Sequence, residues 1–226
     1  DARAAETRFG DGRQTRSRYS FEGKTNGLTT ADGEPLVPAQ ALVHFLDNHD
    51  VPRWLYTFNN ALDRYRNALT FLLTTDGVPC LYYGTEQDFA GGPDPSNRED
   101  MWLSGFDTQN QTFRHVQRLI SLRKSFAPLR RGNLNFLMTS SESADENARE
   151  PNAGILAFTR EYKEERVIVV LNIHDTRAAQ TVLNDQGMET GYPEGTLLFD
   201  ALSDAEIEVG AGGRIRLELL PNQAMI

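Results

Sequence analysis

Cysteine is scarce in this sequence, and that scarcity excludes a disulfide within the chain. Cys80 is the single cysteine among 226 residues. It lies in the short apolar run at residues 78–81, where we expect it to be buried as a small hydrophobic side chain. The low cysteine content does not by itself fix the compartment in which the protein works.

Long apolar runs and an excess of positive charge are also missing. No apolar segment approaches the roughly 20 residues that a membrane-spanning helix needs, although hydrophobic residues make up 39% of the chain and can supply a core. The formal net charge is -9, which argues against nucleic acid and anionic membranes as partners. A globular protein with an uncharged ligand fits this composition.

The first forty residues have little that predicts regular structure. Residues 1–40 are polar and contain turn dipeptides such as Asn26-Gly27 and Asp32-Gly33, which predict loops. The basic cluster of Arg13, Arg16 and Arg18 is interpreted as part of a solvated loop. The chain begins with neither an initiator methionine nor an apolar signal core, so we expect it to be part of a longer protein.

A strand–helix–strand unit is predicted next. Residues 41–46 form an apolar run, interpreted as a buried strand, that ends in the polar residues 47–50. Apolar residues then recur at helical spacing over residues 62–73, and a second apolar run covers residues 78–83. This order is typical of parallel strands. Because parallel strands end at the same edge of a sheet, we expect residues 47–50 and 85–88 to lie close together at that edge.

The pattern changes in the second half of the chain. A long loop (residues 89–111) leads into a predicted helix around residues 113–122 that ends before Pro128. Beyond it lie short alternating runs at residues 134–138, 154–159, 167–172, 180–183, 196–200, 206–209 and 214–219. Such runs predict an antiparallel sandwich or small barrel. We therefore predict two domains, an α/β part at residues 1–128 and an all-β part at residues 129–226.

Asn48, His49 and Asp50 are the first candidates for chemistry, because they follow the first predicted strand directly. A histidine and an aspartate there could form a metal pair, an acid–base pair or a hydrogen-bonding platform for a sugar. A metal site would need further ligands at suitable spacing. The plain alternative is that His49 and Asp50 simply satisfy each other at a strand end.

A second candidate group lies in the long loop. Asp94 and Arg98 resemble a polar clamp, and Trp102 nearby could supply an aromatic face for a sugar ring. Proteins bind sugars through planar hydrogen-bonding groups and through aromatic faces that pack against the pyranose ring. The plain alternative is an ion pair between Asp94 and Arg98 that holds the loop together.

Three segments resemble the α-amylase family, glycoside hydrolase family 13. The sequence Phe-Leu-Asp-Asn-His-Asp at residues 45–50 is similar to that family's fourth conserved region, and residues 77–87 resemble its eighth barrel strand. Asp-Pro-Ser-Asn-Arg at residues 94–98 is similar to the loop that follows, especially in amylases and cyclodextrin glucanotransferase-like members. All three occur in the family's order, and together they are more specific than any one. The resemblance is close over residues 41–102, whereas the all-β tail is similar only in general pattern.

The resemblance implies a (β/α)8 TIM barrel followed by an antiparallel β domain. The runs at residues 41–46 and 78–83 would be the seventh and eighth barrel strands. This chain would then hold the last two βα units of an incomplete barrel and a C-terminal β-sandwich. Because a full barrel takes about 250 residues, about six further βα units are expected in a missing N-terminal barrel segment.

The resemblance also implies roles for individual side chains. Asp50 would be the catalytic carboxylate that stabilises the transition state. The substrate, an α-glucan oligosaccharide or polysaccharide, would be bound by His49, Asn48, Tyr83, Asp94 and Arg98. The family's retaining mechanism also needs a nucleophile Asp and a general-acid Glu, which are expected upstream. Glu22 and Glu34 lie in turn-like sequence and are poor candidates for these roles.

Cofactors and alternative functions follow from the same resemblance. No cofactor or metal site is assigned in this chain, because the calcium ligands of many family members lie upstream; any Ca²⁺ would belong to the full-length protein.

The main hypothesis is that the chain is part of an enzyme that cleaves α-1,4-glucans. The alternatives are a non-catalytic carbohydrate-binding remnant and a transglycosylase of the same family. A His-Asp metal phosphohydrolase is disfavoured, because such enzymes carry the pair on helices and Pro52 follows a β-like run.

A folding prediction follows from the incomplete barrel. Two barrel strands alone leave open edges and an exposed apolar face. We therefore expect residues 1–127 to be unstable without the remaining barrel, and residues 129–226 to fold alone. Amide hydrogen exchange on the isolated chain tests this, and strong protection of residues 42–46 would contradict it.

Overall fold

The computed structural model describes residues 29, 33, 38–140 and 150–226. The loop predicted over residues 1–40 therefore lies largely outside the described residues, as do Arg13, Arg16, Arg18, Glu22 and Glu34. Among the described residues, no helix is both long enough and apolar enough to cross a membrane.

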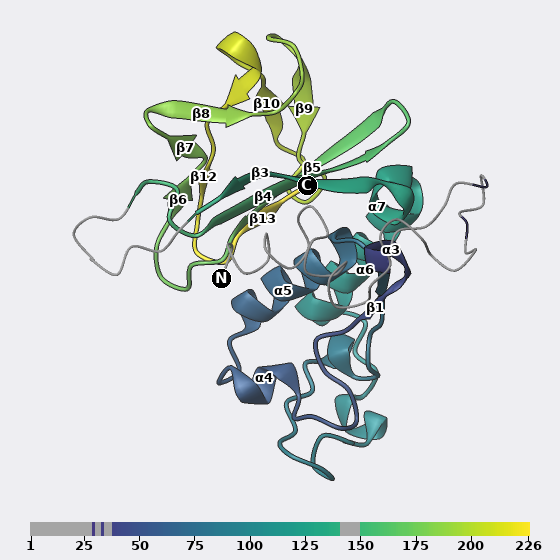
Figure 1. Cartoon of the computed structure of the whole chain (residues 1–226). Helices are drawn as coiled ribbons and strands as arrows, with labels where there is room; N and C mark the ends of the chain where they lie inside the picture. The colour runs from purple at the N-terminus through teal and green to yellow at the C-terminus, as the bar shows by residue number, and fades with distance from the viewer. Residues whose placement is uncertain (1–28, 30–32, 34–37, 141–149) are drawn as a thin grey trace.

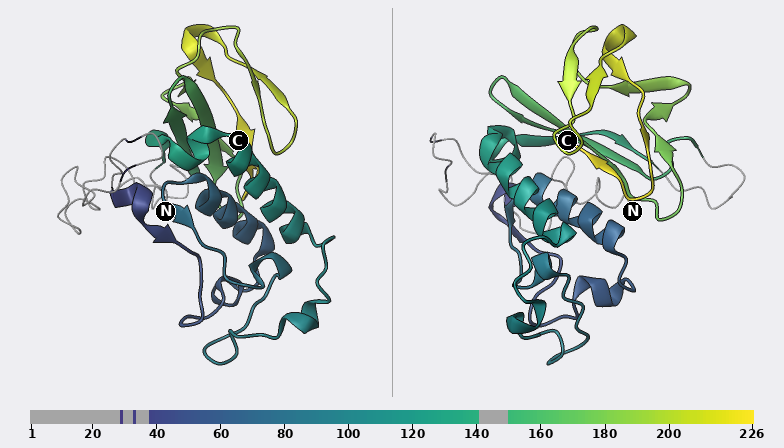
Figure 2. Two further views of the ribbon diagram at one scale, coloured as in Figure 1. Left: turned by 90° about the vertical axis from the view of Figure 1, so that its right-hand side faces the viewer. Right: turned by 180° about the vertical axis from the view of Figure 1, so that it is seen from behind.

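The predicted strand–helix–strand unit is present. In chain order, the first elements are α3 (Pro38–Ala41), β1 (Val43–His44), α4 (Trp54–Thr57), α5 (Leu62–Thr74), β2 (Val78–Pro79) and the 3₁₀ helix η1 (Thr85–Gln87). Strands β1 and β2 pair in parallel, which confirms the predicted orientation. The loops that follow the two strands lie at the end of the molecule away from the β-rich part (Figures 1 and 2).

Backbone hydrogen bonds show why proline is tolerated in β2. The amide of Val78 donates to the carbonyl of Leu42 at 2.8 Å, and the amide of Cys80 donates to the carbonyl of His44 at 2.7 Å. The nitrogen of Pro79 falls between these two donors. Because neighbouring residues of a strand direct their amides to opposite sides, its missing N–H removes no bond to β1.

One face of this short sheet is exposed, which corrects the sequence-based expectation of a buried strand. Val43, Phe45 and Val78 are 57%, 49% and 51% exposed, and Cys80 is exposed as well. The opposite face is packed, since Leu46 contacts the main core. The prediction that Cys80 is buried was therefore wrong, because its side chain lies on the face that no described residue covers.

Helices and a long loop connect β2 to the β-rich part. The loop contains η2 (Met101–Ser104), and it leads to α6 (Gln111–Ser125) and α7 (Ala127–Arg131). Asn110 caps α6, since its side-chain oxygen accepts from the amides of Thr112 and Phe113 at 2.7 and 3.4 Å. The short helix α7 was not predicted, and it crosses the boundary placed after residue 128. The division into two domains there stays a prediction.

Antiparallel strands make up the rest of the chain. They are β3 (Asn133–Thr139), β4 (Ile155–Tyr162), β5 (Glu165–Asn172), β6 (Ala179–Gln180), β7 (Val182–Leu183), β8 (Gln186–Glu189), β9 (Leu197–Phe199), β10 (Glu206–Glu208), β11 (Arg214–Ile215), β12 (Glu218–Leu219) and β13 (Ala224–Met225). The four-stranded sheet has the order β13-β5-β4-β3, and the smaller groups are β11-β8-β7, β12-β6 and β10-β9. The 3₁₀ helix η3 (Ala211–Gly213) precedes β11. Strand β8 was missed, whereas β13 falls in the terminal run at residues 223–226, whose pattern is strand-like. Two predicted runs are each split into two strands.

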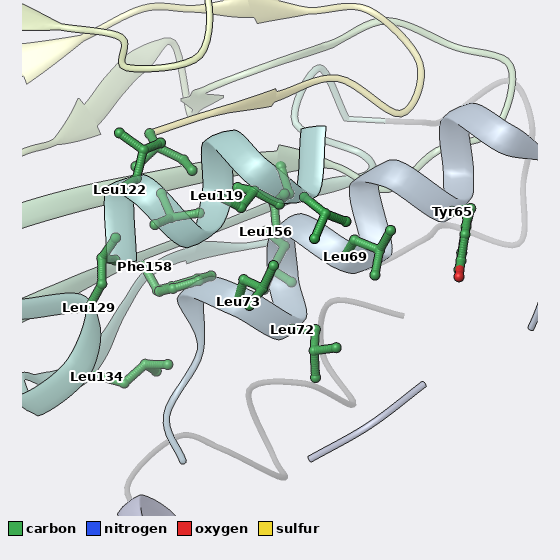
Figure 3. Packing of buried hydrophobic residues seen from close by; sticks show 14 of the residues in the cluster. Tyr65, Leu69, Leu72, Leu73, Leu119, Leu122, Leu129, Leu134, Leu156 and Phe158 are labelled. Atoms are coloured by element: carbon green, nitrogen blue, oxygen red, sulfur yellow. The ribbon is translucent and has the colours of Figure 1, made fainter. Parts of the chain in front are cut away.

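A single apolar core joins the helices to this sheet. Leu69 and Leu73 of α5 and Leu119 of α6 pack in one cluster with Leu156 and Phe158 of β4 (Figure 3). The alternate β4 residues, Ile155 and Ala157, point into a second cluster on the other face of the sheet. Strand β4 is therefore buried on both faces. Because the main core draws on both predicted domains, the expectation that residues 129–226 fold alone remains to be tested by experiment.

Arg160 of β4 makes a polar connection through the same interface. Its side chain is 1% exposed, and its guanidinium donates to the carbonyls of Thr74 and Thr75, both at 2.6 Å. These carbonyls lie at the end of α5, where helical partners run out. An ion pair with Asp76, at 3.1 Å, completes the contact. Burial raises the pKa of Asp76, and the nearby charge of Arg160 opposes this shift.

Removing Arg160 should therefore destabilise the fold strongly. Arg160→Met leaves Asp76 buried without its cation and leaves carbonyls unpaired, which costs about 3–5 kcal/mol. Arg114→Met, on the exposed side of α6, is the control and should change the unfolding free energy by less than about 0.5 kcal/mol. Chemical denaturation of both variants measures the difference, and equal midpoints would contradict the role of Arg160.

Candidate active site

The loop after β1 presents two of the predicted site residues to solvent. The side chains of His49 and Asp50 are 58% and 71% exposed, and Nε2 of His49 lies 3.3 Å from Oδ1 of Asp50. Asn48 is half-buried, and its side-chain oxygen accepts from the amide of Asp50 at 2.8 Å. This Asx turn sets the direction in which Asp50 leaves the backbone.

The loop after β2 carries the other predicted residues. Nε of Arg98 lies 2.7 Å from Oδ1 of Asp94, and both side chains are about half exposed. The hydroxyl of Tyr83 donates to the carbonyl of Glu99 at 2.9 Å, and the residue is 42% exposed. Trp102 is 79% exposed. The ion pair that the sequence suggested is present.

Asn97 fastens the two loops together. Its side chain is fully buried, and its Nδ2 donates to the carbonyls of Asn48, His49 and Val51 at 3.4, 2.9 and 2.9 Å. The expectation that the polar ends of both strands meet at one edge is therefore met in an altered form. The contact with the backbone of the first loop comes from Asn97, which lies beyond the 3₁₀ helix η1 (Thr85–Gln87).

Arg53 forms a second connection between the loops. It is 0% exposed, its Nε donates to Oε2 of Glu99 at 3.2 Å, and its Nη1 lies 4.0 Å from Oδ1 of Asp47. Its guanidinium lies over the rings of Tyr82 and Tyr83, 4.1 and 5.0 Å from their centroids. Cation–π contacts of this kind strengthen when water is excluded.

Asp47 belongs to this buried layer and not to the surface, where the sequence had placed it. It is 3% exposed and accepts from the amide of Trp54 at 2.8 Å. Burial raises the pKa of Asp47, while the bond from Trp54 and the charge of Arg53 lower it. Asp47 therefore fixes the chain as it turns toward α4, and it does not face a ligand.

Sequence reasoning missed the roles of Arg53 and Glu99. The one local signal is that an arginine stands between Pro52 and the apolar pair Trp54-Leu55. Its partner Glu99 is 46 residues away, so spacing along the chain gives no indication of the pair. Among the described residues there is no group of three or more His, Cys, Asp or Glu that could hold a metal ion.

Comparison with known proteins identifies the family. Residues 18–102 match the model of the alpha amylase catalytic domain. Residues 147–226 match the model of the maltogenic amylase C-terminal domain. The chain belongs to the α-amylase family. Its architecture is that of a catalytic-domain portion followed by a C-terminal domain made mostly of strands.

Curated relatives within this family carry several activities in their names. Neopullulanase 2 of Thermoactinomyces vulgaris is 35% identical over 192 residues, 85% of this chain and 30% of that protein. Alpha-amylase 2 of Schwanniomyces occidentalis is 30% identical over 72% of this chain and 29% of its own length. A cyclomaltodextrin glucanotransferase from Bacillus sp. (strain 38-2) is 32% identical over 76% and 22%. The chain thus spans less than a third of the length of these relatives.

Solved structures show the same relationship. An Anoxybacillus alpha-amylase superimposes with a TM-score of 0.66 at 28% identity, covering 83% of this chain and 37% of the other. The alpha-amylase of Geobacillus thermoleovorans, complexed with acarbose, gives 0.64 at 26% identity, covering 83% and 38%. This chain therefore shares the fold of the matching part of these enzymes over 83% of its own length.

Loss of the Arg53 side chain should loosen the loops after β1 and β2. Arg53→Met leaves Glu99 and Asp47 without their shared cation, which costs about 3 kcal/mol of unfolding free energy. Arg64→Met removes a half-exposed ion pair with Asp175 and should cost less than about 1 kcal/mol. Denaturant titration compares the two variants. If Arg53→Met were as mild as the control, Arg53 would not be the connection we infer.

Proposed function

We propose that this chain is the C-terminal part of an α-amylase-like glycoside hydrolase that cleaves α-1,4-glucosidic bonds in starch-like glucans with retention. The observation that carries the proposal is the junction of the two loops through Asn97. It holds exposed His49 and Asp50 beside the turn that bears the Asp94–Arg98 pair. These side chains occupy the positions that match the family's motifs.

The chemistry of glycoside cleavage suits this arrangement. The sugar ring that is attacked develops positive, oxocarbenium-like charge in the transition state. The exposed carboxylate of Asp50 can bind hydroxyls of the distorting ring and favour that state over the ground state. His49, with its ring nitrogen toward Asp50, would donate to a hydroxyl of the same ring. Asp94 and Arg98 would bind a sugar further toward the non-reducing end.

The nucleophile and the general acid would come from barrel strands that precede this segment. The exposed apolar face of β1 and β2 supports this part of the proposal, because Val43, Phe45 and Val78 are 57%, 49% and 51% exposed. Further strands of a (β/α)8 barrel would cover that face. On this proposal, β1 and β2 are the seventh and eighth barrel strands, and the antiparallel sheets form a β-sandwich domain.

Transglycosylation is the second candidate function. It is favoured by the similarity to cyclomaltodextrin glucanotransferases at 32% identity. The same Asp50 chemistry would serve both reactions, since they differ in whether water or a sugar takes the glycosyl group. A carbohydrate-binding remnant without turnover is the third, and the experiments below separate it from the first two.

Replacing Asp50 should nearly abolish turnover in the complete protein. Asp50→Asn removes the charge that stabilises the transition state, so we expect the rate of starch hydrolysis to fall by at least about 100-fold. Asp63→Asn, an exposed carboxylate on α5, is the matched control and should keep the wild-type rate. Near-normal hydrolysis by Asp50→Asn would contradict the catalytic role.

The 226 residues alone should release no reducing sugar from starch. One carboxylate cannot serve as nucleophile and as acid in turn. A reducing-sugar assay on the purified chain measures this, with the complete protein as the positive control. Turnover by the chain alone that is lost in Asp50→Asn would show that the missing groups are not needed.

A further inference from the structure

Asn97 differs from its neighbours in the turn at residues 94–98. Asp94, Ser96 and Arg98 are exposed, whereas Asn97 is fully buried. Its amide nitrogen meets three backbone carbonyls of the loop that carries Asp50. A buried donor shared among carbonyls is costly to lose, because the carbonyls cannot recover their bonds from water.

The turn that holds Asn97 is itself firmly built. The amide of Ser96 donates to the carbonyl of Pro93 at 2.9 Å, and that of Arg98 donates to the carbonyl of Pro95 at 3.0 Å. Gly91 packs against the turn so closely that a Cβ added to it would lie 1.9 Å from the carbonyl oxygen of Ser96. Displacing Asp94 or Arg98 would therefore move Asn97 with them.

On the other side of the junction, the path to Asp50 is short. Asn97 donates to the carbonyls of Asn48 and His49, and the side chain of Asn48 accepts from the amide of Asp50 at 2.8 Å. Each step is a direct hydrogen bond. The turn at residues 94–98 and the loop that carries Asp50 are therefore joined through Asn97 into one connected unit.

We propose that Asn97 is a positioning residue that couples the Asp94–Arg98 sugar clamp to the placement of Asp50. The inference rests on the function proposed above and adds a role for a residue that touches no substrate. A glucan long enough to reach the clamp holds the turn in place, and through Asn97 it holds the carboxylate where the reacting ring needs it. Binding energy from the remote sugar is then expressed in kcat and not only in KM.

The dependence of kcat on glucan length tests this coupling in the complete protein. We expect wild-type kcat to be higher for maltoheptaose than for maltotriose. In Asn97→Ala this advantage should disappear, and kcat for maltoheptaose should fall by about 10- to 100-fold, as small misplacements of reacting groups do. The KM for maltotriose should stay close to the wild-type value.

The matched control is Asn67→Ala. Asn67 is also buried, and its Nδ2 donates to the carbonyl of Asn172 in β5 at 2.7 Å and not to a carbonyl of the site loops. This variant should lose thermal stability much as Asn97→Ala does, but it should keep the wild-type ratio of kcat values. If Asn97→Ala also kept that ratio, Asn97 would be merely structural and the proposal would be overturned.

Amide exchange gives a measurement that does not depend on turnover. In the complete protein, the amide of Asp50 should exchange faster in Asn97→Ala than in wild type or Asn67→Ala. Unchanged exchange at Asp50 would overturn the anchoring itself. A complete wild-type protein that hydrolyses no α-1,4-glucan would instead contradict the proposed function, and the exchange measurement would still decide whether Asn97 anchors the loop.

Discussion

Burial of one arginine between two loops is the constraint on which the site depends. Arg53 is itself fully buried with its positive charge, and it is tolerated there because Glu99 pairs with it and the rings of Tyr82 and Tyr83 cover it. Arg53 lies in the loop after the first strand and Glu99 in the loop after the second, so the pair joins the two loops. The loops are therefore placed by the parallel sheet and then fixed to each other.

The β-rich part supports this arrangement from the far end of the helices. Arg160 of β4 binds the last carbonyls of α5 and pairs with Asp76, just before β2 begins. Leu69 of α5, Leu119 of α6 and Phe158 of β4 pack in one apolar cluster between the helices and the sheet. The position of β2, and with it the second loop, thus depends on contacts with residues more than 80 positions further along the chain.

Sequence patterns predicted the elements whose residues are periodic and failed where the contacts are distant. Helix α5 and the hairpin of β4 and β5 follow from spacing alone. Strand β8 was missed because Gln186–Glu189 contains a glycine and has little alternation. Cys80 was expected to be buried because its neighbours are apolar, but burial depends on what covers a strand and not on its composition. The motif at residues 45–50 predicts a role for Asp50, whereas the bonds of Asn97 to that loop join residues 46 to 49 positions apart, which no local pattern indicates.

We propose that the joined loops present Asp50 and the Asp94–Arg98 pair to one α-glucan chain. A crystal structure of the complete protein with bound acarbose tests it most directly. We expect Asp50 and His49 to contact the ring at the cleavage position, and Asp94 and Arg98 to contact a ring further along the same molecule. Acarbose bound elsewhere, or bound with Asp50 turned away from every sugar ring, would contradict it.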